Sequence, residues 1–283
     1  MARRQTPRPS YTTPTVLRPP DVVHHLWGDE ESGLVGDEVL MSSDLLHALI
    51  FTLPPGGKFG HSQDNRTVFA ADEVYVVLEG TIAIANPQSG EVCVAAAGEF
   101  VFFRRDTWHH GINRSSGPAR VLELFAPPPA AGTASTYAKN APYLDDVKYT
   151  RDDLLGNWPE GRSAAAAKAT LHHIRRADET LRLEGDLLVG VVASTEHLTV
   201  TENELLAGDR SDLRVHSGDA FFIVTEGAVH VHTPDSDGPN WWAVPAGDAF
   251  VVPQGFSYRL INQGGSSARF VFGSAPGYLP SST

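Results

Sequence analysis

The stretch GEFVFFRRDTWHHGIN, residues 98–113, places an apolar and aromatic run before two histidines and an asparagine. The stretch GDAFVVPQGFSYRLIN, residues 247–262, repeats this frame with a tyrosine where the first copy has a histidine. A second pair of similar segments, EVYVVLEG at 73–80 and AFFIVTEG at 220–227, has nearly the same separation along the chain. Two pairs of similar segments with nearly equal spacing along the chain indicate that the chain contains a duplicated unit.

The duplicated unit has the pattern of a β domain. Between residues 45 and 127, and again beyond residue 181, short runs rich in Val, Ile, Phe and Leu alternate with Gly, Pro and Asn. Such runs between turn residues are typical of strands. Duplication of a β unit therefore predicts an all-β fold of two packed jelly rolls or barrels. Between the units, an alanine-rich segment that begins at Ser163 predicts a short helix.

Composition restricts the class of function. A chain of 283 residues with 41% hydrophobic residues is long enough for two domains, each with its own core. The formal net charge of -12 argues against a nucleic-acid-binding surface. No apolar stretch approaches the roughly 18 to 20 residues of a membrane span, and the basic start MARRQTPRPS lacks the apolar segment of a signal peptide. We therefore expect a soluble, cytoplasmic protein that binds neither nucleic acid nor membrane.

The two repeated stretches resemble the second sequence motif of the cupin superfamily, which runs G(x5)PxG(x2)H(x3)N. Residues 98–113 fit its spacing through Gly98, His109 and Asn113, although an arginine and an aspartate replace its proline and glycine. Residues 247–262 keep that proline and glycine but have lost the histidine. The resemblance implies two tandem cupin jelly-roll β-barrels, a bicupin. Together with the five prolines in residues 1–20 and the change of composition after the first unit, it gives four expected parts: a disordered or extended arm at 1–20, a metal-binding N-terminal cupin at 21–128, a linker with a short helix at 129–180, and a C-terminal cupin at 181–283.

The first cupin motif, G(x5)HxH(x3–4)E(x6)G, is matched less closely. Glu73 and Gly80 fit its last two positions, and His61 with Gln63 supply the H-x-H positions if the segment DNRTVFAAD is an inserted loop. The resemblance then implies one divalent metal ion bound by His61, Gln63, Glu73 and His109. Gln63 is either a weaker fourth ligand or a residue that orients a ligand.

The alternation of side chains along a strand supports a convergent site. Glu73 shares a face with Tyr75 and Val77, and His109 shares one with Asn113. If these faces line the barrel, a carboxylate and an imidazole meet in one pocket. His61 would complete two histidines and one carboxylate, a set that suits non-haem Fe(II). Zn, Mn, Ni and Cu are the alternatives.

Other residues near these motifs have less definite roles. Tyr75 is interpreted as pocket lining or a general acid, and Arg66 as a clamp for an anionic substrate or a solvated loop residue. His110 should point away from His109, toward the surface or an interface. In the second half, an alanine and Tyr258 replace the glutamate and histidine, so the C-terminal cupin is expected to bind no metal.

The resemblance favours a metal-dependent enzyme, and our leading hypothesis is an Fe(II) dioxygenase that acts on a small organic metabolite. A redox-inert metal-dependent isomerase, lyase or cyclase is the first alternative. A non-enzymatic cupin that binds a small ligand is the second. Exposed sheet edges and the N-terminal arm predict a homodimer.

Overall fold

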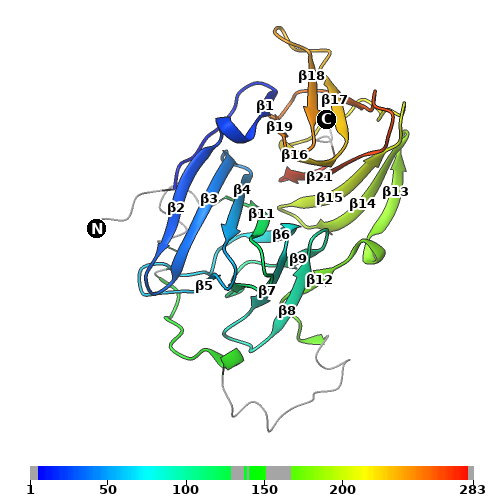
Figure 1. The fold of residues 1–283 in the computed structure, drawn as a ribbon. Helices are drawn as coiled ribbons and strands as arrows, with labels where there is room; N and C mark the ends of the chain where they lie inside the picture. The colour runs from blue at the N-terminus through cyan, green and yellow to red at the C-terminus, as the bar shows by residue number, and fades with distance from the viewer. Residues whose placement is uncertain (1–5, 129–136, 139, 151–166, 280–283) are drawn as a thin grey trace.

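Two antiparallel β-barrels lie back to back in the computed structural model of the chain, which describes residues 6–128, 137–138, 140–150 and 167–279 (Figure 1). Each barrel has one seven-stranded sheet and one smaller sheet. The seven-stranded sheet of the N-terminal barrel contains, in spatial order, β12 (His172–Ile174), β9 (Phe100–Phe103), β6 (Asp72–Glu79), β11 (Ala119–Ala126), β4 (His47–Leu53), β3 (Gly33–Ser42) and β2 (Val23–Asp29). Its smaller sheet contains β5 (Lys58–Phe59), β10 (His110–Asn113), β7 (Thr81–Ala85) and β8 (Val92–Ala96).

The C-terminal barrel repeats this plan. Its seven-stranded sheet contains β1 (Thr15–Leu17), β19 (Ala249–Val252), β16 (Asp219–Glu226), β21 (Ala268–Ala275), β15 (Thr199–Leu205), β14 (Leu187–Ser194) and β13 (Thr180–Glu184). Its smaller sheet contains β18 (Trp241–Pro245), β17 (Ala228–His232) and β20 (Arg259–Ile261). Three short 3-10 turns complete the described elements: η1 (Pro19–Asp21), η2 (Lys148–Thr150) and η4 (Arg176–Asp178).

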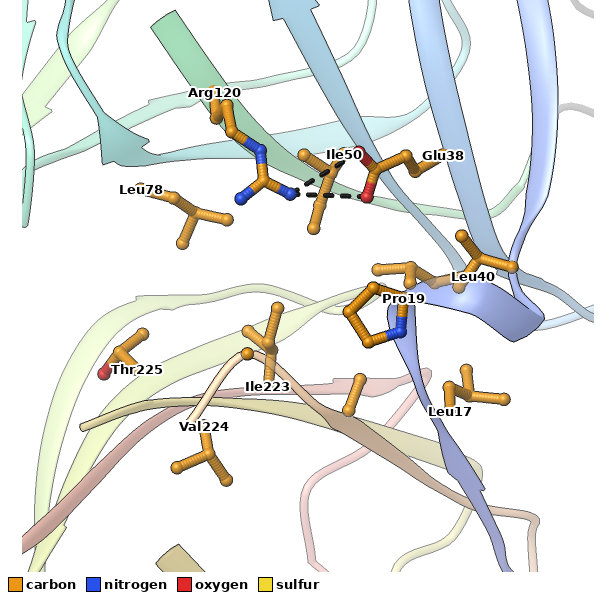
Figure 2. A pocket seen from close by; sticks show the side chains of 13 residues that line it. Leu17, Pro19, Glu38, Leu40, Ile50, Leu78, Arg120, Ile223, Val224 and Thr225 are labelled. Carbon is orange, nitrogen blue, oxygen red and sulfur yellow. Dashed lines mark hydrogen bonds and ion pairs between the residues drawn. The ribbon is translucent and has the colours of Figure 1, made fainter. Parts of the chain in front are cut away.

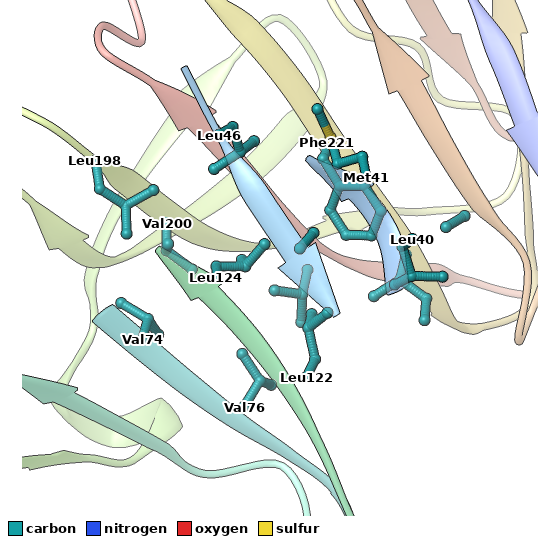
Figure 3. Packing of buried hydrophobic residues seen from close by; sticks show 14 of the residues in the cluster. Leu40, Met41, Leu46, Val74, Val76, Leu122, Leu124, Leu198, Val200 and Phe221 are labelled. Atoms are coloured by element: carbon teal, nitrogen blue, oxygen red, sulfur yellow. The ribbon is translucent and has the colours of Figure 1, made fainter. Parts of the chain in front are cut away.

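The central strands of each seven-stranded sheet are buried on both faces, which explains the nearly continuous hydrophobic runs in the sequence. On β6, Tyr75 and Val77 face the barrel interior, whereas Val74 and Val76 belong to a core shared by the two barrels. Figure 3 shows this shared core, in which side chains of β6 and β11 lie opposite side chains of β15 and β16. Each large apolar side chain buried there stabilises the contact by about 1.5–3 kcal/mol.

Each barrel receives one edge strand from a part of the chain outside its own repeat. Strand β1 of the N-terminal arm pairs with β19, and Leu17 enters the shared core. Strand β12, which follows the first repeat, pairs with β9 of the N-terminal barrel. Residues Thr15–Leu17 of the arm therefore form an edge strand of the seven-stranded sheet of the C-terminal barrel.

The segment expected to be helical begins at Ser163, and its residues up to 166 lie outside the described residues. Within its described part, His172–Ile174 is a strand, so the helical expectation is wrong there. The open edge of β9 supplies backbone partners to this segment, and tertiary pairing overrides a local helical preference. None of the helices among the described residues has the length and apolar character to cross a membrane.

Candidate active site in the N-terminal barrel

A group of acidic and polar side chains projects into the N-terminal barrel from its seven-stranded sheet. Asp37 on β3, Glu73 and Tyr75 on β6, and Glu123 on β11 all lie on inner faces and are buried. Strands β6 and β11 are neighbours, with Tyr75 opposite Glu123. Burial, and then the Glu123 charge, raise the pKa of both Glu73 and Tyr75. The strand register therefore collects carboxyl groups at one end of the barrel interior.

His109 approaches this group from the loop before β10. Its Nε2 atom lies 3.8 Å from Oε2 of Glu73, and both side chains are almost fully buried. Its Nδ1 atom lies 3.2 Å from the Thr107 carbonyl oxygen, so Nδ1 carries the proton and Nε2 presents a lone pair toward Glu73. Burial lowers the pKa of His109 to about 4, which keeps the ring neutral. Oε2 of Glu73 has no hydrogen-bond partner among the described residues.

The barrel interior disfavours negative charge on its carboxyl groups. Burial, and then the neighbouring Glu123 charge, raise the pKa of Glu73 well above its usual range. Burial raises the pKa of Glu123 to about 7, and burial with the Glu123 charge raises that of Asp37 to about 8. Among the described residues of the N-terminal half, no Lys or Arg is buried. The group must therefore hold protons or be neutralised by a cation from outside the chain.

Aromatic rings surround His109 on the remaining sides. Ring centroids of Phe59, Phe69, Tyr75 and Phe103 lie 6.2, 5.7, 5.8 and 4.7 Å from that of the imidazole. These rings fix the orientation of the imidazole and limit the access of water to the space beside Glu73.

His61 and Gln63 do not join this group. His61 uses both ring nitrogens elsewhere, since Nδ1 lies 2.6 Å from Nε2 of His110 and Nε2 lies 2.8 Å from the Leu144 carbonyl oxygen. Gln63 is exposed. Among the described residues, no set of three His, Cys, Asp or Glu side chains is arranged as a metal site. Of the four ligands implied by the resemblance, the structure brings together Glu73 and His109 only.

His110 is not a surface residue, which excludes the first of the two positions expected for it. It is 5% exposed, and its Nδ1 atom lies 2.8 Å from the Tyr149 hydroxyl group. It does point away from His109, as strand alternation requires, but the segment that follows the first repeat covers that outer face. His61, His110 and Tyr149 thereby join this segment to the barrel.

The spacing of the first motif identifies what replaced its histidines. In the motif, three or four residues separate the H-x-H pair from the glutamate. With three residues before Glu73 and no insertion, the two histidine positions fall on Thr67 and Phe69. The Thr67 carbonyl oxygen accepts a hydrogen bond from the backbone of His109 at 3.1 Å, and the Phe69 ring packs on the imidazole. The sequence alone could have shown this replacement, because the spacing of the motif reaches Thr67 and Phe69 without any inserted loop.

The two remaining predicted residues have defined surroundings. Arg66 donates to the carbonyl oxygens of Ala138 and Ala141 at 2.8 and 2.6 Å, and its guanidinium lies 5.3 Å from the centre of the Tyr143 ring. It thus holds the segment after the first repeat against the barrel. Tyr75 lines the interior beside Glu123. Their expected roles toward a substrate stay predictions.

The corresponding positions of the C-terminal barrel carry a different group. Arg214, His216, Ala220 and Tyr258 stand where the first repeat has Thr67, Phe69, Glu73 and His109, and the Tyr258 backbone donates to the Arg214 carbonyl oxygen at 2.9 Å. The buried Arg214 guanidinium pairs with Glu184 at 3.0 Å and donates to the Tyr278 hydroxyl group. His216 Nε2 lies 2.8 Å from the Tyr258 hydroxyl oxygen. A fixed internal cation therefore occupies this interior.

Two tandem jelly-roll barrels with a partly retained ligand pattern define the class of protein. The cupin domain matches residues 49–125 and 202–273, together more than half of the chain. The chain therefore belongs to the cupin family, as a two-domain member.

Solved structures support the same tandem fold. A serine-to-alanine mutant of Bacillus subtilis oxalate decarboxylase is 15% identical, with a TM-score of 0.63 over 94% of this chain and 78% of that chain. Another structure of that enzyme, from work on its Mn(II) centres, is 14% identical, with a TM-score of 0.62 over 98% of this chain and 80% of that chain. AerE from Microcystis aeruginosa is 9% identical, with a TM-score of 0.58 over 90% and 97%. A search of curated protein sequences finds no match.

Proposed function

We propose that the N-terminal cupin is the active site of a divalent-metal-dependent enzyme that acts on a small organic molecule. The observation that carries this proposal is the unpartnered Oε2 atom of Glu73, buried 3.8 Å from the lone pair of His109 Nε2. Two acceptor atoms in this arrangement are best satisfied by a cation between them. Their separation suits donors that each lie roughly 2.0–2.2 Å from one ion. The buried acidic group, which has no buried Lys or Arg beside it in the described part of the N-terminal half, adds an electrostatic attraction for the cation.

The donor set favours an ion that prefers oxygen. The expectation of Fe(II) depended on two histidines, and His61 is hydrogen-bonded to His110 instead. One imidazole beside carboxyl groups is closer to the preference of Mn(II) or Mg(II). We therefore favour Mn(II), which was among the alternatives, and the similar oxalate decarboxylase has Mn(II) centres. Such an ion would polarise a substrate oxygen as a Lewis acid.

The side chains of the chain itself suit proton-transfer chemistry better than oxygen chemistry. The Glu123 carboxyl group, whose pKa is raised by burial to about 7, lies opposite Tyr75 and can hold a proton near Glu73, and the aromatic wall around His109 limits water. A lyase or isomerase of small organic acids or carbonyl compounds is therefore preferred. An Fe(II) dioxygenase is the competing enzyme class, and it predicts oxygen uptake with an iron-loaded protein and a substrate panel.

Metal titration of the chelator-treated protein tests the site. We expect one Mn(II) per chain by isothermal titration calorimetry, with binding weakened at least about tenfold in Glu73→Gln and in His109→Ala. His61→Gln serves as the matched variant, because His61 is equally a buried histidine but lies outside this group. Circular dichroism of each variant confirms folding.

Two outcomes would overturn the proposal. The first is a folded wild-type protein that binds neither Mn(II) nor Fe(II) under anaerobic conditions. The second is a His61→Gln variant that loses metal as completely as Glu73→Gln, which would restore the original ligand set.

A metal-free cupin that binds a small ligand is the second candidate. Thr67 and Phe69 favour it, because they remove two imidazoles from the positions of the first motif. It predicts that the protein binds its ligand equally well with and without a chelator.

A further inference from the structure

A cavity of about 170 Å³ lies between the outer faces of the two seven-stranded sheets, beside the shared core (Figure 2). Strands β3, β4, β6 and β11 supply one wall, β16 and β19 the other, and the arm residues Leu17 and Pro19 close one side. The cavity is separate from the barrel interior. Glu38 and Arg120 line it, whereas their neighbours Asp37 and Val121 face into the N-terminal barrel.

Most of the side chains that line the cavity are apolar. Leu40, Ile50 and Leu78 of the N-terminal barrel face Ile223 of the C-terminal barrel across the space. Its volume is below the roughly 300–1,000 Å³ of pockets that hold drug-sized ligands. The cavity therefore suits a small molecule with an apolar body.

A single ion pair interrupts this apolar wall. Nη2 of Arg120 lies 3.3 Å from Oε2 of Glu38, and the two side chains are 37% and 24% exposed. Glu38 is the only partner that the described residues offer Arg120, and it engages one of the guanidinium nitrogens. In Figure 2 the guanidinium group lies between Glu38 and Leu78, at the edge of the cavity. A guanidinium has five N–H donors in a planar fork that matches a carboxylate, so this group can bind a second one.

We propose that this cavity binds a small amphipathic carboxylate, with its carboxylate on Arg120 and its apolar chain between the two sheets. Charge complementarity selects the acid, and the apolar walls select a hydrocarbon body. An occupant would contact both cupins and so stabilise their contact. The site is independent of the proposed metal centre, because it lies on the opposite face of the same strands.

Titration with sodium octanoate tests this inference in the full-length protein. We expect saturable binding by isothermal titration calorimetry and a rise in melting temperature. Arg120→Met should weaken octanoate binding at least about tenfold, because the charge-assisted hydrogen bonds are lost. Leu78→Trp should abolish binding by filling the cavity. Neutral 1-octanol should bind the wild type and Arg120→Met equally.

Matched variants keep the test decisive. Arg269 occupies the position of Arg120 in the second repeat and pairs with Glu204 at 2.9 Å, so Arg269→Met should leave octanoate binding unchanged. If Arg120→Met does not fold, Glu38→Gln replaces it and should strengthen binding by freeing the guanidinium. Absence of octanoate binding, or equal binding by wild type and the Arg120 or Glu38 variant, would overturn the inference. So would loss of octanoate binding in Glu73→Gln, which would assign the ligand to the barrel interior.

Discussion

Acid should destabilise the C-terminal barrel through His216, whose side chain is 6% exposed. Its Nδ1 atom donates to the Tyr278 carbonyl oxygen, and its Nε2 atom accepts from the Tyr258 hydroxyl group. Burial, and then the positive charge of Arg214, lower the pKa of this imidazole to about 4. The hydrogen bond to the Tyr278 carbonyl and the Glu184 charge raise the pKa of His216, but by less than burial and Arg214 lower it. The folded state therefore holds a neutral ring at pH values where an exposed histidine is charged.

The size and sign of the effect follow from proton linkage. In the unfolded chain the histidine pKa is about 6.5, so the unfolded state binds more protons between about pH 6.5 and pH 4. Stability is present above this window and is lost as the pH falls through it. For His216 alone, a pKa of about 4 in place of about 6.5 corresponds to a loss of about 3 kcal/mol.

Urea unfolding at pH 7, 6, 5 and 4, followed by circular dichroism, measures this effect. The informative variant is His216→Phe, which introduces the residue type found at the equivalent Phe69. It removes the hydrogen bonds of His216 to the Tyr258 hydroxyl group and the Tyr278 carbonyl oxygen, which costs about 1–3 kcal/mol at every pH. The free energy of unfolding of this variant should nevertheless fall by about 3 kcal/mol less between pH 6.5 and 4 than that of wild type. Exposed His24, changed to Gln, is the control that should follow wild type. Parallel declines of wild type and His216→Phe would refute the reasoning.

Three further predictions concern the N-terminal barrel and the arm. Gly111→Ala should destabilise the protein by about 1–3 kcal/mol in urea unfolding, because a Cβ there would lie 2.3 Å from the buried Phe59 ring; wild-type stability would contradict this. Removal of residues 1–17 should lower the free energy of unfolding by at least about 2 kcal/mol, since it withdraws Leu17 and the β1 hydrogen bonds; an unchanged urea midpoint would argue that the arm is dispensable. The double change Thr67→His with Phe69→His restores the H-x-H pair and should strengthen Mn(II) binding in calorimetry; unchanged affinity would mean that these positions do not reach the ion. The expected homodimer stays a prediction, which sedimentation velocity can check.

The fold was largely accessible from sequence because it is encoded in local patterns. The repeated frames around His109 and Tyr258 marked the duplication. Alternation on β6 correctly placed Glu73 on one face with Tyr75, and the structure shows that this face is the inner one. Edge strands were harder to find. Nothing local in residues 172–174 marks them as a strand, because only the edge of β9 makes them one.

The candidate site was only partly accessible from sequence. Glu73 and His109 follow from motif spacing. His61 was assigned to the site because we assumed an inserted loop to keep a histidine in the motif, whereas the uninterrupted spacing places Thr67 and Phe69 at the histidine positions. Glu123 was missed because it lies in an apolar run, LELF, that otherwise predicts ordinary core. Its meeting with Glu73 depends on the pairing of β11 with β6, which joins residues far apart in the chain.

The exchanged edge strands have a consequence for dissecting the protein. A cut between the repeats, within residues 129–170, would give one fragment that keeps β1 but lacks β12, and another that keeps β12 but lacks β1. Each fragment would contain a barrel with one missing edge and a strand with no sheet to join. The two fragments should therefore be unstable when expressed separately and should reconstitute when expressed together. The chain is thus one interlocked unit, although its sequence consists of two repeats.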